Sequence, residues 1–355
     1  MYAVIMAGGR GTRFWPRSRS TLPKQMLDIT GKKTMIQQTV ERILPVVDKE
    51  NIYIVTNIEQ VETLKKQLPD INDNNIIAEP FGRNTAPCIC LAAAKITKND
   101  PDAVMAVLPA DHYMGDNTGF CDCISMAGQV ALESSALVTI GITPDKPETG
   151  YGYIEFDEKT LSPASNAYNV ISYHEKPDIN KARDYLSKGN YLWNSGMFVW
   201  KVETILKNIK RFLPETYKEI MNISDCFDTP DFDIFLKQAY EKIEPISIDY
   251  GVLEKADSVL TIKGDFGWND IGSWTAIHDI SKKDKDNNVL IGDVISVDSS
   301  DSLVYNKNKL TAIVGIKDIY VVETEDALLI CSKDKVQDVR KVVDELEKKG
   351  KFKYL

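Results

Sequence analysis

The 355-residue chain lacks the features that mark membrane and secreted proteins. It contains no run of about 18 apolar residues, so the sequence offers no membrane-spanning helix. Residues 1–11 have no basic start of the kind found in signal peptides, and their apolar run ends in glycines, which favours a buried strand. We therefore expect a cytoplasmic protein with no membrane partner.

Positive charge and metal-binding side chains are also scarce. Lys and Arg number 43 against 52 Asp and Glu, a net charge of −9, which argues against general nucleic-acid binding but not against a local basic site for an anion. The six cysteines, with no secretory signal, are expected to be reduced thiols. There are three histidines, none near a cysteine, and the spacings of zinc sites are missing.

The order of apolar segments predicts an α/β fold. Strands alternate with helices through about residue 142, which favours parallel βαβ units in a Rossmann-like sheet. Extended stretches after residue 145 predict that the same sheet continues as a mixed sheet. Ligands in such folds bind at the carboxyl ends of the strands. The expected early strands cover residues 2–7, 51–57, 75–80, 103–111 and 136–142.

The chain divides into two predicted domains. Residues 1–280 form the expected catalytic domain, and the charged stretch 281–288, with nothing to bury, is the expected linker. Residues 289–355 contain short, evenly spaced strands typical of a small β-solenoid or β-roll, followed by a helix over 333–349. We assign no chemistry to residues 289–331 and expect their exposed strand edges to pair in a homodimer.

A glycine-rich loop follows the first predicted strand. Its glycines allow a phosphate to approach the backbone closely, and two basic residues add positive charge, so the loop suits a polyphosphate; the alternative is a glycine turn with solvated cations. The dinucleotide fingerprint fails because Phe14 replaces its third glycine, which excludes a nicotinamide dehydrogenase. The candidate residues are Gly8, Gly9, Gly11, Thr12, Arg13 and Lys24.

The string G-G-x-G-T-R-x-x-P-x-S over residues 8–18, followed by P-K-Q at 23–25, resembles the signature of sugar-1-phosphate nucleotidylyltransferases. The resemblance extends over essentially the whole chain. It implies the nucleotide-diphospho-sugar transferase fold, a Mg²⁺ cofactor and catalytic roles for Arg13 and Lys24. The string E-P-x-x-R-N-T-A-P at 79–87 is typical of the guanylyl branch, which implies GTP and mannose 1-phosphate as substrates and GDP-mannose and diphosphate as products.

Glu79 and Asn84 lie between the third predicted strand and the next helix. A carboxylate offers two acceptors to the N1–H and N2–H₂ donors of guanine, whereas adenine would leave it mispaired. The resemblance also places the base here. The alternative for Glu79 is a solvated side chain beside an ordinary helix cap, with Asn84 or Thr85 as the capping residue.

Two aspartates at strand ends are the candidate metal ligands. Asp111 ends the fourth predicted strand, and Asp270 follows the stretch 259–266. Mg²⁺ is commonly held by one or two carboxylates together with phosphate oxygens, and the resemblance assigns both residues to the metal. Either aspartate could instead serve as a turn or cap residue. His112 is interpreted as a loop residue rather than a base.

Five residues farther along the chain are the candidates for sugar-phosphate binding, although each alone also fits an ordinary turn. A glycine allows close backbone approach, a carboxylate or amide can bind sugar hydroxyls, and a lysine can bind the 1-phosphate. The motifs E-K-P and D-Y-x-x-x-E-K carry the resemblance in this part. The residues are Gly152, Glu175, Lys176, Asn194 and Asp249.

Two alternatives remain open at this stage: the same chemistry with another sugar 1-phosphate or nucleotide, and a non-catalytic nucleotide-sugar sensor.

The sequence departs from the resemblance at His174, where an apolar residue is common. Longer relatives carry an additional isomerase domain, for which these 355 residues leave no room, so isomerase activity is not expected.

Overall fold

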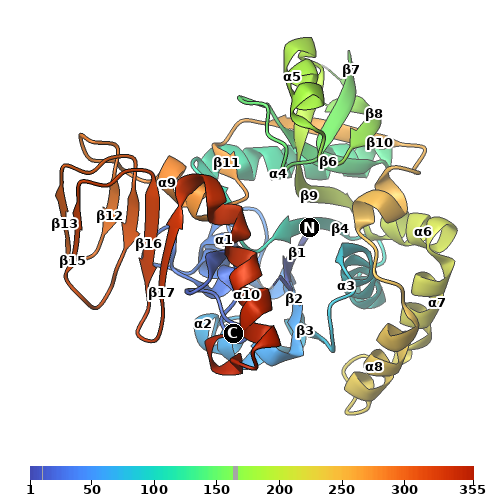
Figure 1. Ribbon diagram of the computed structural model, residues 1–355. Helices are drawn as coiled ribbons and strands as arrows, with labels where there is room; N and C mark the ends of the chain where they lie inside the picture. Colours follow the sequence, from blue (N-terminus) through green and yellow to red (C-terminus); the bar gives the residue numbers. More distant parts are fainter. Residues whose placement is uncertain (10, 163–166) are drawn as a thin grey trace.

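A computed structural model describes residues 1–9, 11–162 and 167–355, and one large mixed sheet forms the centre of its N-terminal part (Figure 1). The strands follow the order β3-β2-β1-β4-β9-β6-β10-β8-β7. They are β3 (Ile76–Glu79), β2 (Ile52–Asn57), β1 (Tyr2–Ala7), β4 (Val104–Pro109), β9 (Tyr191–Lys201), β6 (Leu137–Ile142), β10 (Val259–Gly264), β8 (Ala167–His174) and β7 (Tyr153–Ser162).

The strand pairing confirms the expected α/β class. β1 pairs in parallel with β2 and β4, and β2 with β3, as βαβ units require. β9 then runs antiparallel between β4 and β6, so the later strands continue the same sheet. Within β1, Ala3 and Ile5 join the core on one face of the sheet and Val4 joins the core on the other, which explains why this strand is apolar throughout.

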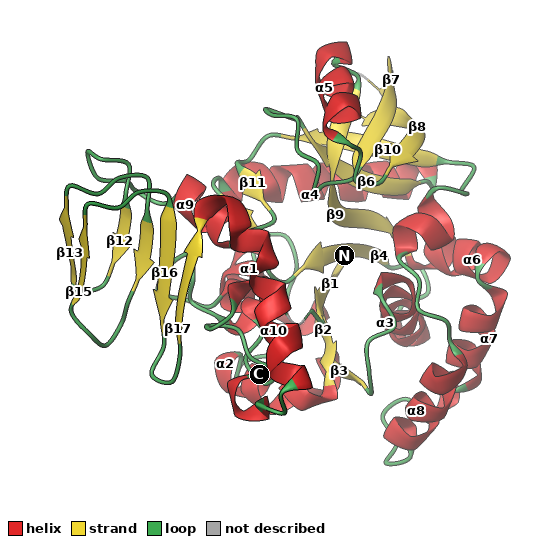
Figure 2. Cartoon of the chain, in the orientation of Figure 1, coloured by secondary structure: helices red, strands yellow, loops and turns green. Residues whose placement is uncertain are grey.

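Helices cover both faces of this sheet (Figure 2). The core on one face includes residues of α1, α2, α4 and α5, and the core on the other includes residues of α3, α6, α7 and α8. Their bounds are α1 (Met35–Ile43), α2 (Val61–Gln67), α3 (Thr85–Asn99), α4 (Asn117–Ser134), α5 (Ile179–Lys188), α6 (Val202–Phe212), α7 (Pro214–Asn222) and α8 (Phe232–Lys242). None of the described helices has the length and apolar character needed to cross a membrane.

The register of the parallel strands brings their carboxyl ends to one edge. Met6 of β1 lies opposite Pro109 of β4, and Asn57 of β2 lies opposite Glu79 of β3. Just beyond β4, the short strand β5 (Tyr113–Met114) pairs antiparallel with β11 (Trp268–Asn269). This pairing carries the residue after β11, Asp270, to the same edge of the sheet.

The C-terminal strands coil into a small β-solenoid, as expected. β12, β14 and β16 stack in parallel, β13 and β15 stack in a second parallel sheet, and β17 closes the first sheet in the antiparallel direction (Figure 2). The elements are β12 (Val289–Ile291), β13 (Val294–Val297), β14 (Leu303–Tyr305), β15 (Thr311–Val314), β16 (Ile319–Glu323) and β17 (Leu328–Ser332), with α9 (Trp274–Ile280) before them and α10 (Val339–Lys348) after them.

The solenoid shares a hydrophobic core with the glycine-rich loop and with Met35 of α1. Phe14 and Trp15 from the glycine-rich loop pack in one cluster with Trp274 of α9 and Val339 of α10. The polar stretch 281–288 also takes part in the packing, because Asn288 is 1% exposed and its Nδ2 donates to the carbonyl of Ser299 at 2.9 Å. This segment therefore buries a side chain that its polar composition did not predict to be buried.

Candidate active site

Two cavities at the carboxyl edge of the parallel strands gather the predicted site residues. The first, of about 500 Å³, is lined by Gly8, Gly9, Glu79, Asn84, Gly152, Glu175, Lys176, Asn194, Asp249 and Asp270. The second, of about 390 Å³, is lined by Gly11, Thr12, Arg13, Lys24, Asp111 and Asp270. The cavities adjoin because His112 and Asp270 line both.

The glycine-rich loop is held tightly against the segment that carries Lys24. Gly11 has φ +61°, and a Cβ at this position would lie 2.4 Å from the Cβ of Lys24, so only glycine fits. The Nε2 of Gln25 donates to the carbonyl of Ala7 at 2.6 Å and to that of Gly9 at 3.1 Å. Gln25 therefore positions the loop, a role that the P-K-Q motif signalled but that we did not predict.

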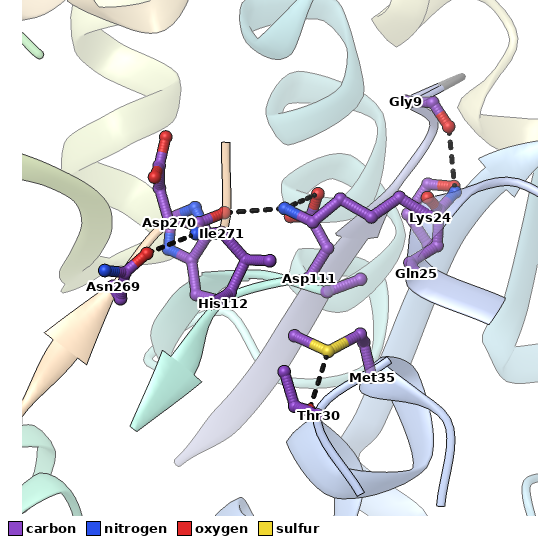
Figure 3. Close-up of polar contacts among 12 residues, drawn as sticks. Gly9, Lys24, Gln25, Thr30, Met35, Asp111, His112, Asn269, Asp270 and Ile271 are labelled. Atoms are coloured by element: carbon purple, nitrogen blue, oxygen red, sulfur yellow. Dashed lines mark hydrogen bonds and ion pairs between the residues drawn. The ribbon is translucent and has the colours of Figure 1, made fainter. Parts of the chain in front are cut away.

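Lys24 connects the two predicted metal ligands (Figure 3). Its Nζ lies 2.9 Å from Oδ2 of Asp111 and donates to the main-chain carbonyl of Asp270 at 2.6 Å. Desolvation alone would raise the pKa of Asp111. The charge and the hydrogen bond of Lys24 help to bring that pKa below its ordinary value. Asp111 is therefore an ionised carboxylate.

Aromatic residues hold the Asp270 side chain in place. The hydroxyl of Tyr151 donates to Oδ1 of Asp270 at 2.9 Å, and the Tyr151 ring packs edge-on against Trp268 at 5.1 Å. The Nε1 of Trp268 donates to Nδ1 of His112 at 3.1 Å. Desolvation lowers the pKa of His112 to about 4, so its ring is neutral and accepts this bond.

The chemistry of these residues fits a Mg²⁺ ion. Asp111 and Asp270 supply hard carboxylate oxygens to one cavity. Among the described residues, no group of three or more His, Cys, Asp or Glu side chains gathers as a metal cluster. A metal held by two carboxylates would complete its coordination with phosphate oxygens and water, which is the usual arrangement for Mg²⁺.

Glu79 also lines the first cavity and is 4% exposed, so it is not the solvated carboxylate of the alternative interpretation. Its Oε1 accepts a hydrogen bond from the hydroxyl of Tyr240 at 3.0 Å. Desolvation raises the pKa of Glu79 to about 7, although the Tyr240 bond opposes this rise. Glu79 is thus a nearly dry carboxyl group that titrates close to neutral pH.

Three residues bordering the cavities have backbone conformations that their side chains disfavour. Asn84 has φ +69°, Lys176 φ +44° and Ile271 φ +48°. The branched Ile271 is the least suited to this region and is held by a bond from its N–H to Oδ1 of Asn269 at 2.8 Å. Asn84 also caps α3, its Oδ1 accepting from the N–H of Thr85 at 2.9 Å. Strain of this kind is concentrated at functional sites.

The predicted sugar-binding residues form one polar cluster. The Nδ2 of Asn194 donates to Oδ1 of Asp249 at 2.8 Å, and Lys176 pairs with Glu175. A Cβ on Gly152 would lie 2.6 Å from Oε2 of Glu175, so the glycine allows the carboxylate to approach. Desolvation, with a contribution from the charge of Glu175, raises the pKa of Asp249.

The segment that carries Asp249 is joined to the segment that carries Asn84 by a main-chain hydrogen bond. The N–H of Ile248, next to Asp249, donates to Oγ1 of Thr85 at 2.8 Å, directly after Asn84. Asp249 itself begins a π-helical turn (Asp249–Leu253), an irregularity frequent at functional sites. The distance between the segment of Asn84 and the segment of Asp249 is therefore fixed by the fold.

Sequence reasoning missed several residues of the site. Tyr151 is not among the predicted site residues, and Tyr240, 161 positions from Glu79, carries no signal in the sequence. Arg340 of α10 also lines the second cavity, although we assigned no site residue to the C-terminal domain. The chain order of strands and loops cannot reveal such distant contacts.

Comparison with known proteins identifies the family. The model described as "Nucleotidyl transferase" matches residues 2–287, and "MannoseP isomerase/GMP-like beta-helix domain" matches residues 292–346. A putative mannose-1-phosphate guanylyltransferase from Vibrio cholerae serotype O1 is 41% identical over 99% of this chain and 75% of its own. The mannose-1-phosphate guanylyltransferase of Salmonella muenchen is 40% identical over 97% of this chain and 73% of its own.

A solved structure is similar over the whole fold. The Thermus thermophilus protein described as a mannose-1-phosphate geranyltransferase is 32% identical, with a TM-score of 0.87 over 98% of this chain and 99% of that protein. Both domains are therefore shared with a relative of similar length. The family expected from the glycine-rich loop is confirmed: the chain belongs to the nucleotidyl transferase family and, within it, to the mannose-1-phosphate guanylyltransferases.

Proposed function

We propose that the chain transfers GMP from GTP to α-D-mannose 1-phosphate, releasing GDP-mannose and diphosphate. The observation that carries this proposal is the first cavity, which brings together Gly8, Gly9 and Glu79 with the polar cluster described above. That cluster consists of Gly152, Glu175, Lys176, Asn194 and Asp249. The names of the similar proteins from Vibrio cholerae and Salmonella muenchen support the same reaction.

Glu79 selects the base in this proposal. Once ionised, it offers two acceptors to the N1–H and N2–H₂ donors of guanine, and its burial makes a mispaired base costly. The hydroxyl of Tyr240 holds Oε1 and orients the carboxylate. Asn84, Gly8 and Gly9 line the same end of the cavity and contact the nucleoside.

The sugar phosphate binds at the opposite end. Glu175, Asn194 and Asp249 accept from or donate to the sugar hydroxyls, and Gly152 lets the ring lie close to the backbone. Lys176 exchanges its bond with Glu175 for the 1-phosphate, which fixes the nucleophile. The left-handed backbone of Lys176 directs this side chain and is part of the site's preorganisation.

In the reaction, a phosphate oxygen of the sugar phosphate attacks the α-phosphorus of GTP. The bond between the α-phosphorus and the oxygen that bridges to the β-phosphorus breaks, and diphosphate leaves. The attacking phosphate is already ionised, so no general base is needed, in agreement with a neutral His112. Arg13 and Lys24, with Gly11 and Thr12, neutralise and position the phosphates. Asp111 and Asp270 would hold Mg²⁺, which supplies further charge stabilisation when bound.

The proposal is tested by measuring diphosphate release over a matrix of nucleoside triphosphates and sugar 1-phosphates. We expect the largest kcat/KM for GTP with mannose 1-phosphate. A larger value for another pair would identify the substrates as different while keeping the chemistry. Tight binding of nucleotide sugars without release for any pair would identify a sensor instead.

We also propose that the protein is a homodimer. Strands β13 and β15 present Ile295, Val297 and Val314 to solvent, with exposed fractions of 50%, 46% and 63%, and Val297 lies opposite Val314 in the register. Such an apolar sheet face favours a second copy of the chain. Light scattering should show a dimer for the native chain and a monomer for Val297→Lys with Val314→Lys; a dimer that persists would place the contact elsewhere.

A further inference from the structure

We propose that Arg340, on the helix that follows the solenoid, binds the departing diphosphate together with Arg13 and Lys24. This inference rests on the proposed function and assigns a substrate-contacting residue to the C-terminal domain.

The helix α10 packs directly on the phosphate-binding loop. It contacts the short turn Thr12–Phe14, and Val339 is buried in the cluster that contains Phe14 and Trp15. The chain beyond α10 adds a second attachment, because the Nε1 of Trp15 donates to the carbonyl of Tyr354 at 2.9 Å. Figure 1 shows α10 lying across the N-terminal part of the molecule rather than alongside the solenoid. The position of the helix relative to the loop is therefore well defined.

Arg340 follows the buried Val339 on α10 and lines the second cavity. Successive residues on a helix are rotated by about 100°. With Val339 in the shared core, Arg340 lies at the rim of the second cavity, which it lines with Arg13, Lys24, Asp111 and Asp270. Three cationic side chains thus surround a space that contains two carboxylates.

Arg340 differs from its neighbours on α10 in forming no ion pair within the described part of the chain. Lys341 pairs with Asp338 at 2.9 Å and Lys348 pairs with Glu345 at 3.0 Å, whereas no ion pair joins Arg340 to any carboxylate of the described residues. Within the cavity, Lys24 is paired with Asp111. Among the described residues that line this cavity, Arg13 and Arg340 are therefore the arginines that no carboxylate pairs.

The arrangement of the two cavities identifies the ligand as diphosphate. The base and the sugar phosphate occupy the first cavity, and the two cavities meet at Asp270 and His112. The β- and γ-phosphates of GTP, which become the leaving group, then extend into the second cavity. A guanidinium can bind phosphate oxygens through two parallel hydrogen bonds, which suits a trianionic leaving group.

The test compares Arg340→Gln and Arg340→Lys with Lys341→Gln, which removes the same charge from the next position of the same helix. Calorimetry in the presence of Mg²⁺ measures binding of inorganic diphosphate and of GMP, which lacks the leaving phosphates. We expect Arg340→Gln to weaken diphosphate binding about 10- to 100-fold with GMP binding unchanged, Arg340→Lys to recover part of it, and Lys341→Gln to match the native protein.

Equal diphosphate affinity in Arg340→Gln and the native protein would overturn the proposal, as would an equal loss for GMP, which would indicate a structural role. The assay also separates this proposal from the proposed function. If the native protein does not turn over GTP and mannose 1-phosphate, but Arg340→Gln still binds diphosphate more weakly than the native protein, the proposed substrates are wrong and the diphosphate site stands.

Discussion

Glu79 and Asp111 lie at the carboxyl ends of two parallel strands of the same sheet, yet their surroundings set opposite protonation behaviour. Glu79 is nearly dry and faces the hydroxyl of Tyr240, and its pKa rises to about 7. Asp111 faces the ammonium of Lys24, and its pKa is lowered. The surroundings of each carboxylate thus set its charge: Glu79 exchanges a proton near neutral pH, whereas Asp111 stays an anion, the form that can bind a metal cation.

The largest effect is expected at the charged end of the site. Asp111→Asn leaves Lys24 without its partner and removes a metal ligand, and Asp270→Asn removes the other, so each should lower kcat by about 10²–10³-fold with the fold intact. The measurement is kcat at saturating GTP over a Mg²⁺ titration. Asp265→Asn, an exposed aspartate after the same strand β10, is the control. Near-native activity in either folded variant would show that the residue does not hold the metal.

The dry end should give a smaller but more selective loss. Glu79→Gln keeps the shape but sets an amide donor against a guanine donor. We expect kcat/KM for GTP to fall by about 2 kcal/mol, roughly thirtyfold, while ATP loses less. Glu241→Gln, an exposed change next to Tyr240, should have no effect. An unchanged ratio of GTP to ATP would mean that another group reads the base.

The raised pKa of Glu79 predicts a pH dependence specific to the base. As the pH falls through about 7, Glu79 gains a proton and loses an acceptor, so kcat/KM for GTP should be about tenfold lower at pH 6 than at pH 8. Tyr240→Phe removes the bond that opposes the rise, and should move the midpoint to higher pH. A pH profile that is identical in Glu79→Gln would assign the titration to a different group.

The last expected effect concerns stability rather than catalysis. The folded state binds the Glu79 proton more tightly than the unfolded chain, so this contribution is complete below the ordinary pKa of 4.5 and is lost as the pH rises to about 7. Glu79→Gln, which cannot ionise, should therefore raise the free energy of unfolding by up to about 3 kcal/mol at pH 8 and change it little at pH 4.5. Urea titrations at both pH values measure this, and equal changes at the two would contradict it.

Much of the fold and of the site's location follows from local patterns. Apolar runs with polar ends located β1, β3 and β4, and the topology of parallel strands brought Gly8, Glu79 and Asp111 to one edge. Asp270 lies at this edge because β11 pairs with β5, a pairing that the sequence around Asp270 does not predict.

The partners that tune the site could not be predicted in the same way. The bond from Tyr240 to Glu79 spans 161 positions and the bond from Tyr151 to Asp270 spans 119. Both depend on how helices and loops pack, not on periodicity. Arg340 is the clearest case. The sequence pattern predicts a helix here, but it does not show that this helix packs on the glycine-rich loop.

The place of β9 has a consequence for synthesis of the chain on the ribosome. β9, residues 191–201, fills the position between β4 and β6, so the edge of β4 has no partner while the intervening residues are translated. An apolar strand with free N–H and C=O groups is a template for pairing with other chains. The nascent protein therefore exposes this edge of β4 from the emergence of β4 until that of β9, an interval in which pairing with other chains is favoured.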